Sequence, residues 1–307
     1  MPFQKFDVAE FPPRHWGLMS YPGDGKSTFS TAMRGPILPI DADHRYGEVA
    51  KLSPEVLKLS NIPSDHNDTD RIAALLNKEM PGSQIGTIVI DSVTSIIAPI
   101  VVQAMMDKEH GRTKNLYAGF KDKALAMRQL QDAVTKWGTD VLWIYHLNDS
   151  RDGNGNEVTK ATLSATELLR LTRSLNMQLQ IVRDGARRGI KVVWARRGRS
   201  NVELWDDSGK WLGMPEKIET AVYGGLSQQD MDRIENSVPE FFPTPEAAMD
   251  WAIEQGAFES ITHARNAYDK LKREQNPGSA SAMWELWVAE CVVRKTAAGK
   301  TEEEQEA

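Results

Sequence analysis

Short apolar runs alternate with longer stretches of helical periodicity over the first two thirds of the chain. Residues 16–20, 36–41, 86–91 and 140–146 have the length and apolar content of buried strands. Helical patterns lie between or after these runs, at 27–33, 69–78, 93–109, 118–137 and 164–174. Since strands that alternate with helices form parallel sheets, the pattern predicts an α/β domain with a mostly parallel central sheet.

The pattern changes after residue 174. The segment "MQLQIVRDGARRGIKVVWARR" predicts two adjacent strands joined by a turn at 185–189, and thus an antiparallel extension at one edge of the sheet. The polar, Gly- and Asn-rich segment 147–160 predicts a mobile loop.

The remaining chain predicts a second, smaller part. We expect a core at 1–215, a linker at 216–243 that contains "VPEFFPTP", a helical C-terminal module at 244–296 and an acidic, disordered tail at 297–307. The module has helical segments at 244–255, 259–274 and 279–294, with Thr244 as a candidate N-cap and Pro245 in the first turn. Its aromatic residues have helical spacing and are interpreted as core: Trp251, Phe258, Trp284 and Trp287.

Composition indicates the cellular compartment and the kinds of partner that the protein can have. The 307 residues include one cysteine, Cys291, so no internal disulfide forms and a reducing, cytoplasmic location is expected. No apolar run is long enough to span a bilayer, and the N-terminus has no signal-peptide core. The net charge of −6 argues against nucleic acid covering the whole surface, but it leaves room for a local basic site.

The segment "SYPGDGKST" has the chemistry of a phosphate-binding loop. Gly23 and Gly25 allow the backbone to turn its N–H groups inward, Lys26 supplies a cation for the β- and γ-phosphates, and Ser27 supplies a hydroxyl ligand for Mg²⁺. Ser20 stands where the usual pattern has glycine, and a solvated turn is the alternative. The preceding strand and following helix favour a nucleotide site over this alternative, with these candidate contacts: Tyr21, Pro22, Gly23, Asp24, Gly25, Lys26, Ser27 and Thr28.

Four further polar residues lie at the ends of predicted strands or just after them. Asp91 ends "TIVID" and is a candidate metal ligand. In "IDADHR", Asp43 is a candidate to orient the attacking water, and Asp41 is a candidate to support the metal shell. His146 ends "VLWIYH" and is a candidate γ-phosphate sensor. Each has a purely structural alternative as a strand-end cap or polar loop residue.

Taken in order, "SYPGDGKST", "IDADHR", "IVIDSVTS" and "VLWIYH" resemble the RecA-like P-loop ATPase core over about residues 14–215. The resemblance implies that Asp43 replaces the catalytic glutamate, one methylene shorter, and that Asp91 is the Walker B acid. His146 stands in place of the sensor glutamine, a substitution associated with phage RecA-like single-strand-annealing ATPases.

The resemblance also implies contacts with DNA and with neighbouring subunits. The loop after the sensor strand would contact single-stranded DNA through Arg151 and Lys160, and "KEHGRTK" would supply Arg112 and Lys114 as a second DNA loop. Residues 183–199 form a basic hairpin, defined by Arg183, Arg187, Arg188, Lys191, Arg196, Arg197 and Arg199. Its targets are DNA phosphates or a neighbour's ATP, and Arg196 and Arg197 resemble residues that act as arginine fingers across the interface. A solvated surface is the alternative for both regions.

These features favour a Mg²⁺- and ATP-dependent protein that binds single-stranded DNA and promotes annealing or strand exchange as a homo-oligomeric ring or filament. The expected setting is a phage protein in the host cytoplasm, with single-strand-binding or replication proteins as further partners and no membrane contact. A helicase loader or motor ATPase is one alternative. A nucleotide-gated scaffold that binds a protein partner is the other.

Overall fold

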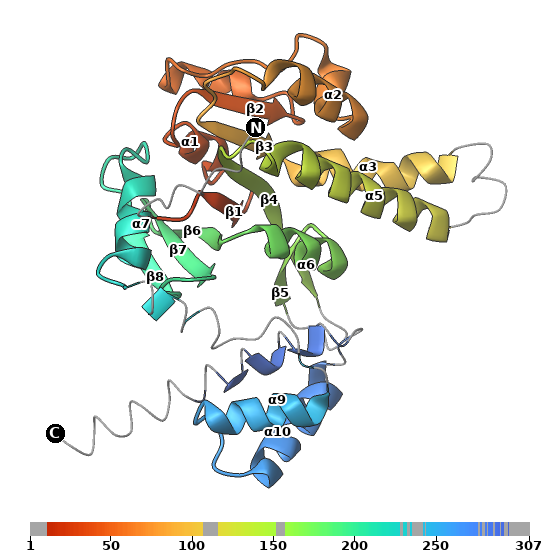
Figure 1. Ribbon diagram of the computed structural model, residues 1–307, viewed down its shortest axis with the longest axis vertical. Coiled ribbons are helices and arrows are strands. Elements are labelled where there is room, and N and C mark those ends of the chain that lie inside the picture. Colours follow the sequence, from red (N-terminus) through yellow and green to blue (C-terminus); the bar gives the residue numbers. More distant parts are fainter. Residues whose placement is uncertain are drawn as a thin grey trace, which may run out of the picture. The chain divides into compact units, whose positions relative to one another are not determined.

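The computed structural model describes residues 11–106, 116–151, 157–227, 230, 231, 234, 242, 244–275, 277, 280, 282–284, 286–288, 290, 291 and 294. The chain divides into two compact units between Leu226 and Ser227. The first unit contains the sheet and the second contains helices (Figure 1).

A single twisted sheet forms the centre of the first unit. Its strands are β1 (His15–Ser20), β2 (Ile37–Asp41), β3 (Thr87–Asp91), β4 (Asp140–Arg151), β5 (Glu157–Ala161), β6 (Met177–Asp184), β7 (Arg187–Ala195) and β8 (Val202–Trp205). The order is β2-β3-β4-β1-β6-β7-β8, with β5 paired to β4. The pairs within β2-β3-β4-β1-β6 are parallel, whereas β6–β7, β7–β8 and β4–β5 are antiparallel. The predicted fold class is therefore confirmed, including the antiparallel extension at one edge.

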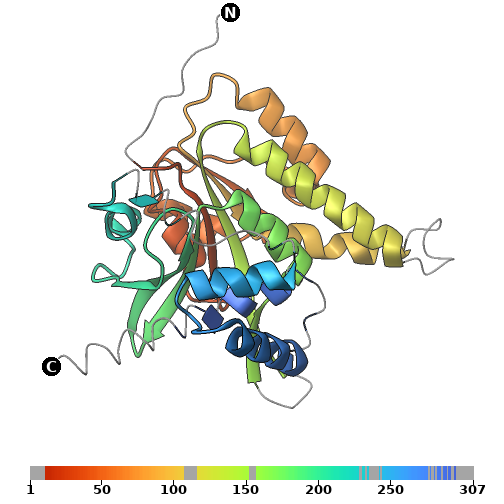
Figure 2. The ribbon, with the colours of Figure 1, turned by 60° about the horizontal axis from the view of Figure 1, so that its bottom comes forward.

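Helices cover the sheet on both sides. Those described in this unit are α1 (Lys26–Ser30), α2 (Thr69–Glu79), α3 (Val93–Met106), α5 (Leu116–Thr135), α6 (Ala165–Ser174) and α7 (Met214–Tyr223), with 3-10 turns at Tyr46–Glu48, Ala50–Leu52 and Pro63–His66. Helices α3 and α5 run side by side (Figures 1 and 2).

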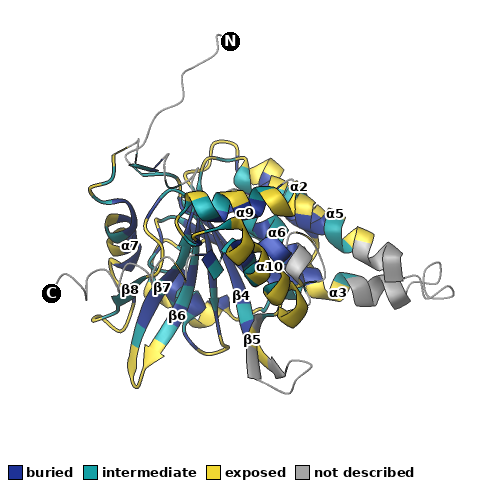
Figure 3. Cartoon of the chain, turned by 90° about the horizontal axis from the view of Figure 1, so that it is seen from below, coloured by how far each residue is buried: buried dark blue, intermediate teal, exposed yellow. Residues whose placement is uncertain are grey.

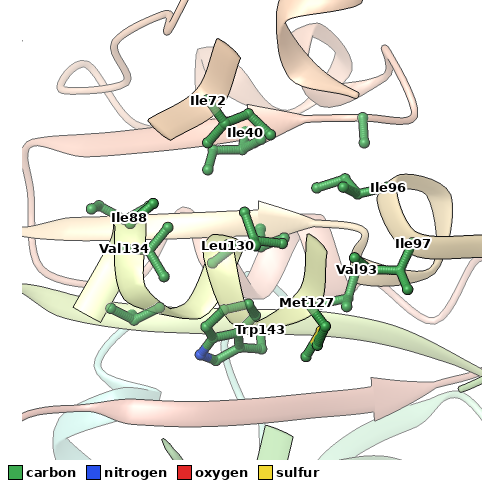
Figure 4. Packing of buried hydrophobic residues seen from close by; sticks show 14 of the residues in the cluster. Ile40, Ile72, Ile88, Val93, Ile96, Ile97, Met127, Leu130, Val134 and Trp143 are labelled. Atoms are coloured by element: carbon green, nitrogen blue, oxygen red, sulfur yellow. The ribbon is translucent and has the colours of Figure 1, made fainter. Parts of the chain in front are cut away.

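The main core lies between the sheet and helices α2, α3, α5 and α6. Met127, Leu130 and Val134 of α5 recur at spacings of three and four residues and face β3 and Trp143 of β4 (Figure 4). On the same strands, Val89 and Leu142 alternate with the core-facing residues and are also fully buried. Burial on both faces is the reason that these strands are apolar throughout, and Figure 3 shows the central strands as buried.

Two segments differ from the sequence prediction. The segment 147–160, predicted as a mobile loop, contains the end of β4 and most of β5, which pair from Leu147↔Ala161 to Arg151↔Glu157. Part of the predicted linker 216–243 is helix α7, in which Ile218 and Val222 are fully buried. Within α7, Glu219 accepts two hydrogen bonds from Arg14, at 2.9 and 2.6 Å, so α7 belongs to the first unit.

The second unit is helical, as expected. It contains α9 (Pro245–Glu254) and α10 (Ile261–Gln275), and its described residues between 280 and 294 are also helical. Thr244 caps α9 by accepting a hydrogen bond from Ala247 N–H, as predicted. Trp287 is fully buried, stacks on Phe258 at 5.2 Å between ring centroids and donates to the Ala248 carbonyl. Phe258, Trp284 and Trp287 are therefore core, as predicted, and Trp251 packs against this core while partly buried.

Candidate functional site

The sheet brings the predicted phosphate-binding residues to one edge. Ser20, which ends β1, pairs in register with His146 of β4, and Asp41 pairs with Asp91 across β2 and β3. Since parallel strands end at the same edge, the loop after β1, Asp91 and His146 lie together there, which is the usual ligand-binding edge of an α/β sheet.

The loop after β1 turns sharply into α1. Gly23 and Gly25 have φ angles of 84° and 96°, a left-handed region that favours glycine. A side chain on Gly25 would also meet Arg188 Nη1 at 2.6 Å. Both glycines are therefore needed for the path of this loop.

Lys26 is almost fully buried inside the loop. Its Nζ donates to the carbonyls of Ser20 and Tyr21 at 3.0 and 2.9 Å and contacts Ser20 Oγ at 3.3 Å. Burial lowers the pKa of Lys26 to about 8, although the charges of Asp91, Asp24 and Asp43 oppose this shift. The Ser20 hydroxyl, which the usual glycine lacks, thus adds one contact to the backbone carbonyls that hold the lysine.

Ser27 and Asp91 bring two side-chain oxygen atoms into contact. Ser27 Oγ donates to Asp91 Oδ2 at 2.6 Å. Burial raises the pKa of Asp91 to about 6, although the hydrogen bond from Ser27 opposes this shift. Mg²⁺ prefers oxygen ligands and is commonly held by one or two protein oxygens together with phosphates and water. The Ser27–Asp91 pair fits such an ion.

Asp43 lies at the same edge and is held by two elements. Ser95 of α3 donates to Asp43 Oδ1, and His146 Nε2 lies 3.8 Å from Asp43 Oδ2. The interaction with His146 lowers the pKa of Asp43 to about 2, despite partial burial, and the hydroxyls of Ser95 and Ser92 contribute. The structure thus joins Asp43 and His146, which sequence analysis had assigned separate roles. Ser95 was missed, although it lies one helical turn after Ser92.

Asp41 has a structural role that the sequence did not indicate. Its two carboxylate oxygens accept the backbone N–H groups of Arg45 and Tyr46, both at 3.0 Å. Asp41 also lines a cavity of about 410 Å³ whose lining does not include Lys26, Ser27 or Asp91. Its carboxylate therefore caps the turn after β2, and since Asp41 pairs in register with Asp91, its support of the metal shell stays a prediction.

The basic hairpin contacts the phosphate-binding loop of its own chain. Arg183 Nε lies 2.7 Å from Asp24 Oδ1, and Arg188 donates to the Gly209 carbonyl at 2.7 Å while its guanidinium lies over Trp211. The run of basic residues is visible in the sequence, but these contacts with distant residues are not. Lys191 and Arg187 also approach acidic residues that are distant in sequence, Glu203 and Asp207. Several cations of the basic hairpin are therefore partly neutralised.

Arg196 and Arg197 lie at the amino-terminal ends of the parallel strands, opposite the end at which the phosphate-binding loop lies. Ala195, just before them, pairs with Met177, the first residue of β6, whereas Arg187 pairs with Asp184, the last. Arg196 donates to the Arg173 carbonyl at 2.9 Å. Their action on a neighbouring subunit stays a prediction.

The β4–β5 hairpin is joined to the phosphate-binding loop. Tyr21 Oη donates to Asp149 Oδ1 at 2.5 Å and lies 3.0 Å from Thr159 Oγ1. Arg151 and Lys160 belong to the strands of this hairpin, but their side chains lie outside the described residues, as do Arg112 and Lys114 entirely. Their contacts with DNA stay predictions.

The glycine-containing loop between β1 and α1 and the contact of Ser27 with Asp91 are the features of a P-loop NTPase core. The AAA domain family matches residues 13–191, which is more than half of the chain, and the chain belongs to this family. Among curated proteins, no sequence matches the chain.

Solved structures that match include a KaiC-like protein from the hyperthermophilic archaeon Pyrococcus horikoshii OT3, with 13% identity over 65% of this chain and 88% of that chain and a TM-score of 0.41. Another is the RadB recombinase, with 13% identity over 64% of this chain and 87% of that chain and a TM-score of 0.35. In the part of the chain that the structure describes, no helix has the length and apolar character needed to cross a membrane.

Proposed function

We propose that the protein is a Mg²⁺-dependent ATPase that binds single-stranded DNA and promotes annealing or strand exchange. The observation that carries the ATPase is the hydrogen bond of 2.6 Å between Ser27 and Asp91, beside the buried Lys26. A hydroxyl and a carboxylate in contact at the start of a helix are the ligands with which P-loop NTPases hold Mg²⁺.

In this proposal Lys26 exchanges its contacts with loop carbonyls for the β- and γ-phosphates of ATP. The N–H groups at the start of α1 add positive potential there. The ion held by Ser27 and Asp91 would neutralise charge that develops on the phosphates. Because Lys26 is already placed by Ser20 and Tyr21, little rearrangement of the loop is needed.

Asp43 is the residue that orients the attacking water. With a pKa of about 2, its carboxylate is ionised at neutral pH and is a weak base. It therefore acts by accepting a hydrogen bond from water rather than by removing the proton early, which suits the loose transition state of phosphoryl transfer. In this proposal His146 responds to the γ-phosphate and transmits that response to Asp43, and the 3.8 Å separation of their side chains supports this role.

The DNA-binding part of the proposal depends on the β4–β5 hairpin. His146 and Asp149 lie on the same strand, and Asp149 accepts a hydrogen bond from Tyr21 in the phosphate-binding loop. A hairpin tied at two points to the nucleotide site can couple a change in one to a change in the other. Arg151 and Lys160 are its candidate phosphate contacts, and Arg196 and Arg197 are candidates for completing a neighbour's site in an oligomer.

ATP turnover with and without single-stranded DNA tests the proposal. We expect turnover by the wild type, stimulation by DNA, and loss of at least about a hundredfold in Lys26→Ala, because preorganised charge in a P-loop supplies several kcal/mol of transition-state stabilisation. The matched control is Lys78→Ala, which removes an exposed lysine on α2 that pairs with Glu79. Equal turnover in Lys26→Ala and Lys78→Ala would refute the ATPase site.

Annealing of complementary oligonucleotides separates the proposed activity from the alternatives. We expect annealing that depends on ATP and DNA binding that weakens as salt rises, because phosphate contacts release counterions. Stimulation by a helicase without annealing would instead indicate a loader. Nucleotide binding without turnover or DNA affinity would indicate a scaffold.

A further inference from the structure

The phosphate-binding loop contains an acidic residue at an unexpected place. Asp24 precedes Gly25 and Lys26, and its side chain is only 12% exposed. Its Oδ2 accepts the backbone N–H of Tyr21 at 3.1 Å. The carboxylate therefore braces the loop from within by closing a short turn.

This brace places a negative charge where a triphosphate is expected. The charge of Asp24 acts on the ammonium group of Lys26, so the carboxylate lies within electrostatic range of the phosphate-binding cation. The Asp24 carboxylate and a bound triphosphate are both negative, and like charges in a partly buried site repel each other strongly. An uncompensated Asp24 would thus weaken the binding of any polyphosphate.

Arg183 supplies the compensation. Besides the 2.7 Å contact of its Nε with Asp24 Oδ1, its Nη2 donates to the Gly23 carbonyl at 3.2 Å. β6 pairs with β1 as far as Gln180↔Met19 and then continues past the end of β1, which brings Arg183 level with the loop.

The hairpin is held in this position by a second arginine. Arg188 pairs with Arg183 across β6 and β7, approaches the Asp24 carbonyl at 3.5 Å and lies 5.3 Å from the ring centroid of Trp211. Trp211 in turn packs edge-on against Phe29 of α1 at 5.7 Å. The approach of Arg183 to Asp24 is therefore fixed by packing on both sides of the loop.

We propose that Arg183 is a positioning residue for the nucleotide: it cancels the charge of Asp24, so that the loop keeps its carboxylate brace and still accepts a triphosphate. Arg183 acts through Asp24 and does not itself contact the phosphates. The inference rests on the proposed binding of MgATP at this loop.

The test compares Arg183→Gln, Asp24→Asn and the double variant, using calorimetric titration with MgATP and MgADP together with steady-state turnover. Arg183→Gln is expected to weaken MgATP binding roughly tenfold, because one unpaired, partly buried carboxylate then repels the phosphates. It should raise KM with little change in kcat. The deficit is expected to be smaller for MgADP, which has one phosphate fewer, and to shrink as salt rises.

The double variant distinguishes a charge effect from a structural one. An asparagine at position 24 can still accept the Tyr21 N–H, so Arg183→Gln with Asp24→Asn is expected to recover most of the lost affinity. The control is Arg71→Gln, which breaks an ion pair of similar exposure, 53% for Arg71 and 11% for Asp65, next to α2. It is expected to bind MgATP as the wild type does.

Two results overturn the inference while leaving the proposed function in place: unchanged MgATP affinity in Arg183→Gln, or a double variant as weak as Arg183→Gln alone. Absence of MgATP binding to the wild type would refute both. Thermal unfolding of each variant identifies any loss of affinity that is due to unfolding.

Discussion

A buried arginine joins the start of the sheet to α7, and its removal should destabilise the first unit. Arg14 is 3% exposed and donates to both carboxylate oxygens of Glu219 and to Glu216 Oε1. Burial alone would lower the pKa of the Arg14 guanidinium, but the hydrogen bonds to Glu219 and Glu216 raise it above its ordinary value. The charged form is therefore strongly held.

The expected magnitude follows from burial. Removing one partner of a buried ion pair costs about 3–5 kcal/mol, because the other charge stays buried and unpaired. Glu219 is 7% exposed and would be left in this condition, whereas Glu216 has an exposed side chain that can turn to water. We therefore expect Arg14→Met to lower the free energy of unfolding by about 3 kcal/mol, at the lower end of that range.

Urea denaturation and hydrogen exchange measure this effect. The urea midpoint of the first unit should fall, and the amides of α7 should exchange faster than those of β3 and β4. Replacing both partners, in Arg14→Met with Glu219→Leu, should recover part of the loss, since an apolar pair of similar volume leaves no unpaired charge at position 219. The buried Asp140 loses Arg14 in either variant but is still approached by Arg34.

Arg34→Gln is the matched control. Arg34 approaches Asp140, another acidic neighbour of Arg14, at 3.5 Å, but its side chain is 61% exposed. Asp140 is buried, but without Arg34 it still accepts the Arg14 backbone N–H and has the Arg14 guanidinium nearby, so this variant should lose less stability than Arg14→Met. If Arg14→Met is no less stable than Arg34→Gln, the assignment of α7 to the first unit by this ion pair is wrong.

Three further outcomes are expected. Asp43→Asn should lower ATP turnover at least about a hundredfold, as is usual for a residue that positions water or a proton. Calorimetric titration should show MgATP affinity near that of the wild type. A loss of affinity in proportion to the loss of turnover would argue against this role. Asp91→Asn should abolish turnover yet raise the free energy of unfolding at neutral pH by up to about 3 kcal/mol. The reason is that burial raises the pKa of the Asp91 carboxyl from 3.8 to about 6, so its ionised form disfavours folding. This gain should shrink as the pH of the unfolding experiment falls from about 6 towards about 4, where the folded carboxyl is protonated. Asp149→Ala should reduce the stimulation of ATP turnover by single-stranded DNA, since it removes the acceptor of the Tyr21 hydroxyl; undiminished stimulation would contradict coupling through this contact.

The parallel strands and the contact between Ser27 and Asp91 could be predicted because each depends on a local signal and one general rule. Apolar runs identify the strands, and parallel strands that end in polar residues collect them at one edge. The hydrogen bond between Ser27 and Asp91, 64 residues apart, follows from these two facts.

The approach of Arg183 to Asp24 could not be predicted. It depends on how far β6 extends past β1 and on the packing of Arg188 against Trp211. These are tertiary properties with no local pattern. The sequence therefore showed an excess of basic residues at 183–199 but not the acidic partners that approach several of them.

The β4–β5 hairpin and α7 were not predicted because the local sequence signals for them are weak. The end of β4 contains Asn148, Asp149 and Ser150, which have low strand propensity, so pairing with β5 overrides local preference there. For α7, a start signal was present, since Pro215 lies in the first turn, but the neighbouring segment of weak periodicity obscured it.

Trp211 is fully buried, lies under Arg188 and packs against the first turns of α1, next to Gly25. An indole shielded from water at this place is a natural fluorophore whose emission depends on the position of the phosphate-binding loop. The chain thus carries its own optical reporter of the loop, and subtracting the spectrum of a Trp211→Phe protein isolates that signal from the other tryptophans.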